Sequence, residues 1–185
     1  MALTKTPVCD FGKKAEDFKL KSIDNKIISL NDIKGDKATL IMFICNHCPY
    51  VKAIIKDLSK ECEELRKDGV NSIAIMSNDT LEYPEDSFDN MKLFFKTHNL
   101  EIPYLYDEDQ NIAKIYNAQC TPDFFGFNSD LKLQYRGRLD SSGRNSNDLN
   151  VERDLFNAMS DIAKSGNGPK NQIPSIGCSI KWKNQ

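Results

Sequence analysis

The stretch that most constrains this chain is ATLIMFICNHCPYV, at residues 38–51. Thr39 to Ile44 is rich in β-branched and aromatic residues and too short for an independent helix, so it predicts a buried strand. Pro49 cannot continue a sheet but suits the first position of a helix, and the residues after it have helical spacing. The apolar face of that helix comprises Val51, Ile54, Ile55, Leu58, Cys62 and Leu65. Two cysteines, Cys45 and Cys48, therefore stand at a strand-to-helix junction.

This junction favours a reactive thiol at Cys48. With Pro49 as the first helical residue, Cys48 is the N-cap, and its sulfur lies by unpaired backbone N–H groups at the positive end of the helix dipole. Such surroundings stabilise the thiolate, the form that attacks disulfides, peroxides and metals. Cys45 can trap an intermediate on Cys48 as a disulfide, and a protonated His47 would lower the thiol pKa further. The alternative is two small hydrophobes beside a turn, but C-x-x-C next to a βαβ pattern is a specific redox signal.

Length and composition predict one globular domain without nucleic-acid or membrane partners. The chain has 185 residues, 39% of them hydrophobic, and a net charge of −2. Its basic residues are scattered, so they form neither a phosphate-binding face nor a patch for anionic lipid. The amino-terminal residues lack the apolar core of a signal peptide, and no apolar run is long enough to span a bilayer. We expect a cytoplasmic protein.

The six cysteines are Cys9, Cys45, Cys48, Cys62, Cys120 and Cys178. They could form three structural disulfides, but a reducing cytoplasm and a chain long enough to build a core argue against it. Cys62 shares the apolar helical face and is expected in the core. Cys9 lies in a polar segment and is not expected to be catalytic.

The order of expected elements predicts an α/β fold. Loop 78–87 follows the second buried strand, at the functional edge of an open α/β sheet. Strands are expected at 17–20, 26–30, 39–44, 70–77, 103–106, 124–127 and 131–139, and helices at 49–67, 87–99, 109–116 and 148–163. This order describes a thioredoxin-like fold, with a central mixed sheet flanked by helices and an N-terminal extension. We expect one domain over residues 1–165 and an extended C-terminal tail over 166–185.

Several long segments resemble one family. They are FICNHCPYVK, SNDTLEYPEDSF, PYLYDEDQNIAKIYNAQCTPDFFGF, YRGRLD and PSIGCSIKWK. In this order they resemble the alkyl hydroperoxide reductase/thiol-specific antioxidant (redoxin) group, and especially its peroxiredoxin-like branch. The resemblance implies a thioredoxin fold with the thiol site at Cys45 and Cys48. It also implies a cis peptide bond between Thr121 and Pro122, in a loop packed beside that site.

The chain departs from the family's patterns in the partner of Cys48. Against a thioredoxin C-x-x-C, residues 48–51 cover the motif, so Cys48 is the attacking cysteine and Val51 replaces its partner. Against the peroxiredoxin P-x-x-x-T-x-x-C pattern, Cys48 is again the reactive cysteine. Cys45 then stands in the threonine position and Ile41 in the proline position, so the peroxide-binding triad is not reproduced. The two alignments agree on Cys48 and differ on its partner.

Two further thiols are candidates for a redox role. Cys120 precedes the Thr121-Pro122 loop and would lie close to Cys48 if that loop packs as in thioredoxins. The alternative is that Cys120 is a small residue opening a buried strand. Cys178 follows a glycine in the tail, which we expect to pack back on the domain with Trp182 as an anchor. Cys178 would then be a resolving or locking thiol, whereas a tail that simply packs or stays mobile would give it no role.

The leading hypothesis is a thiol–disulfide oxidoreductase. The Cys48 thiolate attacks a substrate disulfide or oxidised sulfur, and Cys45 resolves the mixed intermediate. His47 would tune the thiolate, and Thr121-Pro122 would orient the partner. The expected partners are protein or low-molecular-weight thiols and disulfides. A homodimer is one oligomeric state that the sequence leaves open.

A thiol peroxidase is the nearest alternative. Peroxide would convert Cys48 to a sulfenic acid, which would condense with Cys45, Cys120 or Cys178. A redox-inert binding module on the same fold is a further alternative. Outside the thiol site, His98 is expected at the surface or as a helix cap, and Arg136 and Arg138 are expected to be solvated.

Metal binding is an alternative from another class. The HCP sequence at residues 47–49 resembles part of the copper site in Sco-type chaperones, and the candidate soft ligands are Cys45, Cys48, Cys120 and His47. The second cysteine that such a site needs, four residues after Cys48, is Lys52 here. We therefore expect redox-active cysteines, with neither a bound metal nor an organic cofactor.

Overall fold

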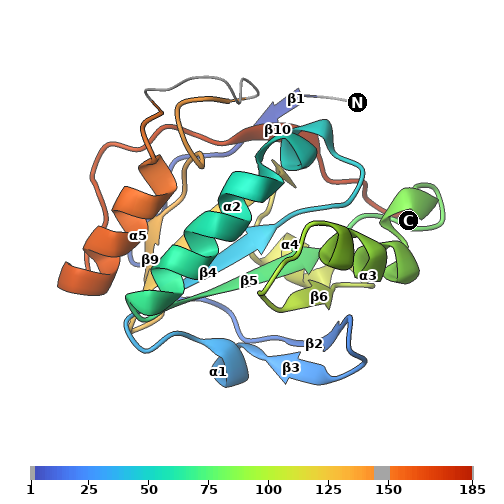
Figure 1. Ribbon diagram of the computed structural model, residues 1–185, viewed down its shortest axis with the longest axis horizontal. Helices are drawn as coiled ribbons and strands as arrows, with labels where there is room; N and C mark the ends of the chain where they lie inside the picture. The colour runs from blue at the N-terminus through green and yellow to red at the C-terminus, as the bar shows by residue number, and fades with distance from the viewer. Residues whose placement is uncertain (1–2, 144–150, 185) are drawn as a thin grey trace.

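The computed structural model describes residues 3–143 and 151–184 of the chain. A seven-stranded mixed sheet forms its centre (Figure 1). From one edge to the other the strands are β3 (Ile27–Ser29), β2 (Lys19–Ser22), β6 (Tyr104–Tyr106), β5 (Val70–Met76), β4 (Ala38–Phe43), β8 (Asp123–Asn128) and β9 (Leu133–Tyr135). One face packs on α2 (Pro49–Lys67), α3 (Phe88–Thr97) and α5 (Asp154–Ser165), and the other on α4 (Asn111–Ile115). This is the mixed sheet between helices that the sequence predicted.

Strand β4 is the centre of this sheet, and every one of its residues is buried. It pairs in parallel with β5, because α2 crosses between them, and antiparallel with β8. Its side chains alternate between two apolar clusters, with Leu40 and Met42 on the side of α2 and Ile41 and Phe43 on the opposite side. The buried strand predicted at residues 39–44 is confirmed.

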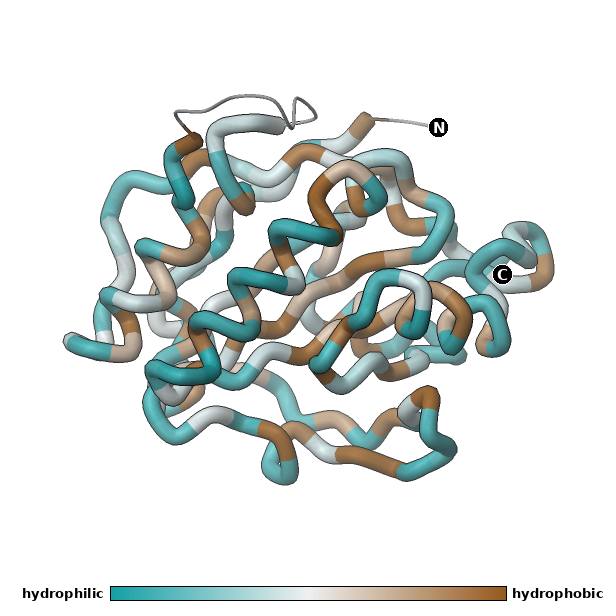
Figure 2. The backbone as a smooth tube through the Cα atoms, in the orientation of Figure 1, coloured by the Kyte–Doolittle hydropathy of each residue, from teal (hydrophilic) through white to brown (hydrophobic). Residues whose placement is uncertain are grey.

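Helix α2 starts at Pro49 and buries the predicted apolar face against the sheet. Figure 2 shows hydrophilic residues on the outward turns of α2 and hydrophobic residues along the strands behind it. The helix ends at Lys67, and Gly69 adopts the left-handed conformation with φ of +84°. Glycine suits this conformation because it has no Cβ, so the predicted glycine cap is confirmed.

A second, three-stranded antiparallel sheet joins both ends of the described chain. Its strands are β1 (Leu3–Lys5), β10 (Ile176–Ser179) and β7 (Cys120–Thr121), in that order. The tail therefore packs back, as predicted. Its anchors are the buried residues Ile180 and Lys181, whereas Trp182 is 41% exposed. The anchor was predicted wrongly because Trp182 lies at the surface, with the ammonium of Lys114 5.9 Å from its ring centroid, and not in the core.

Two smaller elements refine the predicted order. A short helix α1 (Leu30–Ile33) follows β3, and a 3₁₀ turn η1 (Pro84–Asp86) precedes α3. Ser87 is the N-cap of α3 and accepts a hydrogen bond from the backbone N–H of Asn90, and His98 caps the other end. Leu93 on α3 is 61% exposed.

The last helix begins later than residue 148. Within the described residues helix α5 starts at Asp154, and residues 148–150 lie outside them. Arg153, at the N-cap position, pairs with Glu61 at 2.9 Å and Glu64 at 2.8 Å on α2. This contact between helices holds the chain where α5 begins, and residue periodicity does not reveal it.

Arg136 is buried rather than solvated. Its guanidinium pairs with Asp123 at 2.9 Å and lies over the ring of Phe125, 4.4 Å from the centroid. Asp123 is fully buried at the start of β8, so the pair satisfies a carboxylate that would otherwise be isolated in the sheet. Arg138 is also paired, with Asp154 at 2.8 Å.

Among the described residues, no helix combines the length and apolar character needed to cross a bilayer.

Candidate active site

Cys48 is the N-cap of α2, as the sequence predicted. It is fully buried, and the backbone N–H groups of Val51, in the first turn of α2, and of Cys178, in β10, help to lower its pKa. As a thiol it donates to the backbone carbonyl of Thr121 at 3.1 Å. The sulfur therefore lies among donors supplied by a helix N-terminus and by the tail.

Cys45 and Cys48 form an asymmetric pair. The hydrogen bond from the Cys45 thiol, more than any other contact, lowers the pKa of Cys48 to about 4, although burial opposes this. The same bond, together with burial and the negative charge of Asp86, raises the pKa of Cys45 well above its ordinary value. At neutral pH the pair therefore holds one proton, on Cys45, and one negative charge, on Cys48.

The loop at Thr121 and Pro122 packs against both thiols. The peptide bond between these residues is cis, as the resemblance implied. The Cys45 sulfur lies 3.3 Å from the Thr121 hydroxyl, while the Thr121 carbonyl contacts Cys48. The structure thus brings the Thr121-Pro122 loop to Cys45 and Cys48, although more than 70 positions separate the loop from either cysteine in the sequence.

His47 is engaged by a carboxylate that the sequence did not single out. Its Nδ1 lies 2.6 Å from Oδ2 of Asp86, and this contact raises the pKa of His47. Asp86 is fully buried and also accepts from the backbone of Asn46 at 2.8 Å and the side chain of Asn78 at 2.7 Å. Burial opposes its ionisation, but the bonds from His47 and Asn78 keep its pKa below the ordinary value.

The position of His47 changes its expected role. The thiol nearest its ring is Cys45, with Nδ1 4.0 Å from the sulfur. Hydrogen bonds, chiefly from Cys45, account for the lowered pKa of Cys48. The only sequence signal for Asp86 is its place in the loop of residues 78–87, which was predicted to lie at the functional edge.

A family profile described as AhpC/TSA family matches residues 11–136. The chain belongs to the AhpC/TSA family. "Putative peroxiredoxin bcp" of Helicobacter pylori strain J99 is 28% identical to this AhpC/TSA protein over 109 residues, which cover 59% of this chain and 66% of that protein. Thiol-disulfide oxidoreductase ResA of Bacillus thuringiensis subsp. konkukian is 26% identical over 130 residues, 70% of each chain.

Solved structures give the fold of this family member. An uncharacterized conserved protein from Geobacillus kaustophilus has a TM-score of 0.94 at 43% identity, covering 100% of this chain and 98% of that chain. A thiol:disulfide interchange protein of the thioredoxin family from Chlorobium tepidum TLS has a TM-score of 0.57 at 18% identity, covering 68% and 84%. The AhpC/TSA protein therefore has a thioredoxin-like fold.

The two additional thiols of this AhpC/TSA protein differ in their contacts. Cys178 lies directly opposite Thr121 in the pairing of β10 with β7, and the Thr121 carbonyl contacts the Cys48 sulfur at 3.1 Å. Burial, followed by the interaction with the Cys48 side chain, raises the pKa of Cys178 to about 11. Cys120 is also buried, but its thiol donates to the Pro122 carbonyl at 3.4 Å. Of the two, Cys178 is the one whose pKa responds to a side-chain bond with Cys48.

Within the described residues, one group of potential metal ligands occurs, formed by Cys45, His47 and Asp86, whose ligand atoms lie within 4.8 Å of one another. Two of these atoms, on His47 and Asp86, are already hydrogen-bonded at 2.6 Å. Ligands of a tetrahedral metal with bonds of about 2.05 Å lie about 3.3 Å apart. In this arrangement the His47–Asp86 contact is a hydrogen bond, shorter than that ligand spacing.

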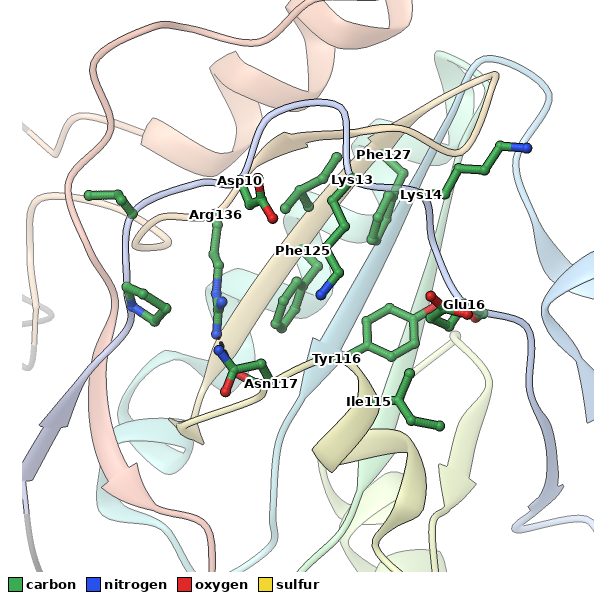
Figure 3. A pocket seen from close by; sticks show the side chains of 13 residues that line it. Asp10, Lys13, Lys14, Glu16, Ile115, Tyr116, Asn117, Phe125, Phe127 and Arg136 are labelled. Atoms are coloured by element: carbon green, nitrogen blue, oxygen red, sulfur yellow. Dashed lines mark hydrogen bonds between the residues drawn. The ribbon is translucent and has the colours of Figure 1, made fainter.

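A pocket of about 170 Å³ lies on the opposite face of the sheet (Figure 3). Phe125, Phe127 and Tyr116 line it and belong to the apolar cluster on that face, whereas Cys45 and Cys48 belong to the cluster under α2. The sheet therefore separates this pocket from the thiols.

Proposed function

We propose that this AhpC/TSA protein is a thiol–disulfide oxidoreductase with Cys48 as its nucleophile and Cys45 as its resolving thiol. The observation that carries the proposal is the place of Cys48 at the N-cap of α2, against the Thr121-Pro122 loop that also contacts Cys45. In this setting Cys45, more than any other group, lowers the pKa of Cys48 to about 4, so Cys48 is ionised at neutral pH, and the thiolate is the attacking form. The similarity to ResA agrees with this activity.

The reaction transfers two electrons from the two thiols to the substrate. The Cys48 thiolate attacks one sulfur of a substrate disulfide, the substrate S–S bond breaks, and the first substrate thiolate leaves and takes up a proton. Cys48 no longer carries a charge, so the hydrogen bond that retained the Cys45 proton is lost. Cys45 then releases its proton and attacks the Cys48 sulfur, which forms the Cys45–Cys48 disulfide and expels the second substrate thiolate.

The proposed compartment agrees with thiol chemistry. A reducing compartment keeps cysteines as thiols, so we propose a cytoplasmic location for the protein. Its substrates would be protein or low-molecular-weight disulfides. Since the Cys48 sulfur is buried, a substrate sulfur reaches it only when a neighbouring segment moves.

Peroxide reduction is the second candidate, and the similarity to the Helicobacter pylori protein favours it. In that reaction Cys48 attacks the peroxide O–O bond and becomes a sulfenic acid, with water or an alcohol leaving. The position three residues before Cys48, threonine in peroxiredoxins, holds Cys45, whose thiol is hydrogen-bonded to Cys48. This replacement makes disulfide exchange the function that the site supports better.

The test compares Cys48→Ser with a remote cysteine variant. We expect wild-type protein to reduce a small aromatic disulfide and Cys48→Ser to lose at least about 99% of that activity, as nucleophile removal does. Cys9→Ser is the matched control, because Cys9 is half-buried and belongs to the other face of the sheet. Full activity in Cys48→Ser would exclude the proposed nucleophile. Faster reaction with hydrogen peroxide than with any disulfide would favour the peroxidase.

A further inference from the structure

Strand β10 is built onto the reactive site. It pairs antiparallel with β7, with Cys178 opposite Thr121. An added Cβ at Gly177 would lie 2.1 Å from the Thr121 carbonyl oxygen, so only glycine allows the strands to approach this closely. Ser175 adds a hydrogen bond from its hydroxyl to the Pro122 carbonyl at 2.9 Å. These contacts fix the tail against the Thr121-Pro122 loop in one register.

Cys178 lies next to Cys48 through Thr121. It pairs with Thr121 in the β10–β7 register, and the Thr121 carbonyl oxygen lies 3.1 Å from the Cys48 sulfur. Each of the two cysteines also shifts the pKa of the other. Cys178 is 4% exposed and belongs to the same apolar cluster as Cys45 and Cys48. The Cys48 sulfur therefore has two thiol neighbours, one in the loop before α2 and one on the tail.

The charges around these two neighbours differ. Cys45 faces the buried carboxylate of Asp86, which opposes ionisation of its thiol. Cys178 faces the ammonium group of Lys181, which favours ionisation. Once Cys48 is part of a mixed disulfide its own charge is gone, and these surroundings then favour a thiolate on Cys178 over one on Cys45.

We propose that Cys178 is a second redox-active thiol that competes with Cys45 for Cys48 and closes a disulfide between the tail and α2. The proposal rests on the proposed function, since Cys48 must first react. After Cys48 has formed a mixed disulfide with the substrate, Cys178 loses its proton and attacks the Cys48 sulfur. The bond between Cys48 and the substrate breaks, the substrate leaves as a thiolate, and the two protein thiols have supplied two electrons to the substrate disulfide.

The product is a Cys48–Cys178 disulfide that tethers β10 over Cys48. Its reduction needs a dithiol, or two monothiols, that can reach the tail. The oxidised protein would thus exist in two forms, one with the disulfide inside the loop before α2 and one with the tail locked on the site.

Tryptic mapping separates these forms in one digest. Cys45 and Cys48 lie on the same peptide, residues 38–52, whereas Cys178 lies on residues 171–181. Reduced full-length protein is treated with one equivalent of dithiobis(nitrobenzoate), alkylated at remaining thiols and digested. We expect the cross-linked pair of peptides in at least about a tenth of the oxidised protein, since exchange between neighbouring thiols equilibrates them. A smaller amount, with the disulfide inside residues 38–52, would overturn the proposal.

Single variants identify the cysteine that is cross-linked to Cys178. Cys45→Ser should keep the cross-link and release two nitrothiobenzoate ions per chain, because Cys178 alone then resolves Cys48. If the cross-link disappears in this variant, Cys178 bonds to Cys45 and the proposal is wrong. Cys178→Ser should lose the cross-link. Cys120→Ser, a buried thiol beside the same loop, is the control and should behave as wild type.

The controls separate this inference from the proposed function. If Cys48→Ser reacts with the reagent as fast as wild type, the proposed nucleophile is wrong and the inference fails with it. If reaction depends on Cys48 but the cross-link does not form, only the role of Cys178 is excluded. Thermal unfolding of each variant shows that the comparison is made between folded proteins.

Discussion

Helix α2 carries two buried cysteines with opposite properties. Cys48 at its N-cap is 0% exposed and Cys62 in its middle is 3% exposed. Nevertheless, the pKa of Cys48 is lowered to about 4, while burial raises that of Cys62 to about 12. The Cys45 thiol lowers the pKa of Cys48 most, and the first turn of the helix adds N–H groups that carbonyls within the helix leave free. For Cys62 a bond with Ser72 does not offset burial. Local interactions, and not exposure, set the pKa values of the two thiols.

The largest expected effect is a difference in alkylation rate. At pH 6 iodoacetamide should modify Cys48 at least about 1,000-fold faster than Cys62, because thiolate fractions follow the pKa values. In the folded protein Cys48 is a thiolate above a pH of about 4, so its alkylation rate should change little between pH 6 and pH 8. Peptide mapping against time measures both rates. Similar rates at the two sites would break the comparison.

The next effect concerns Glu61, which precedes Cys62 on α2. Burial, only partly offset by Arg153, raises its pKa from 4.5 to about 7. A carboxyl with a raised folded-state pKa stabilises the fold below its unfolded pKa, and this stability is lost as pH rises through about 7. Between pH 4.5 and pH 8 wild type should lose about 3 kcal/mol relative to Glu61→Gln, from about 2.5 pKa units. Urea unfolding of both proteins at the two pH values measures this difference, and equal pH dependence would contradict it.

A smaller effect tests the pair at the N-terminus of α2. Cys45→Ala removes the thiol that donates to Cys48, so the pKa of Cys48 should rise by about 1 to 2 units, the value of one hydrogen bond to a charged group. Cys45→Ser is the control, because its hydroxyl can still donate. The ultraviolet absorbance of the thiolate against pH gives the pKa. A shift of the same size in both variants would show that the Cys45 sulfur has another role.

The smallest expected effect concerns the N-cap of α3, which should affect the stability of the fold and not the alkylation rate of Cys48 at the N-cap of α2. Ser87 is the N-cap of α3 and accepts from the N–H of Asn90 at 3.4 Å. Ser87→Ala should lower the free energy of unfolding by about 1 kcal/mol, the usual value of an N-cap bond. It should leave the alkylation rate of Cys48 unchanged. A change in that rate would mean that α3 and its loop contribute to the thiol site.

Local sequence was sufficient for the features that one segment determines. The buried strand, Pro49 as the first helical residue and Cys48 as the N-cap all lie within one stretch of 14 residues, where period and proline geometry apply. The same reasoning placed Cys62 in the core and Gly69 at the helix end. In each case the contacts that decide the structure are close along the chain.

Features that depend on distant pairs could not be predicted in this way. Asp86 bonds to His47 across 39 positions, and only the fold shows that this acid is buried. The residues next to Arg136 in the sequence do not indicate that it is buried by an ion pair with Asp123. The position of Cys178 depends on the register of β10 against β7, which a polar tail does not specify by periodicity.

The place of β10 in the chain also has a consequence for synthesis on the ribosome. All seven strands of the central sheet precede β10, so they emerge before it and can assemble while the tail is still being made. During that interval Cys48 lacks the amide donor and the cover that β10 provides. The nascent protein therefore passes through a stage in which Cys48 is less protected, and the pairing of β10 with β7 ends that stage.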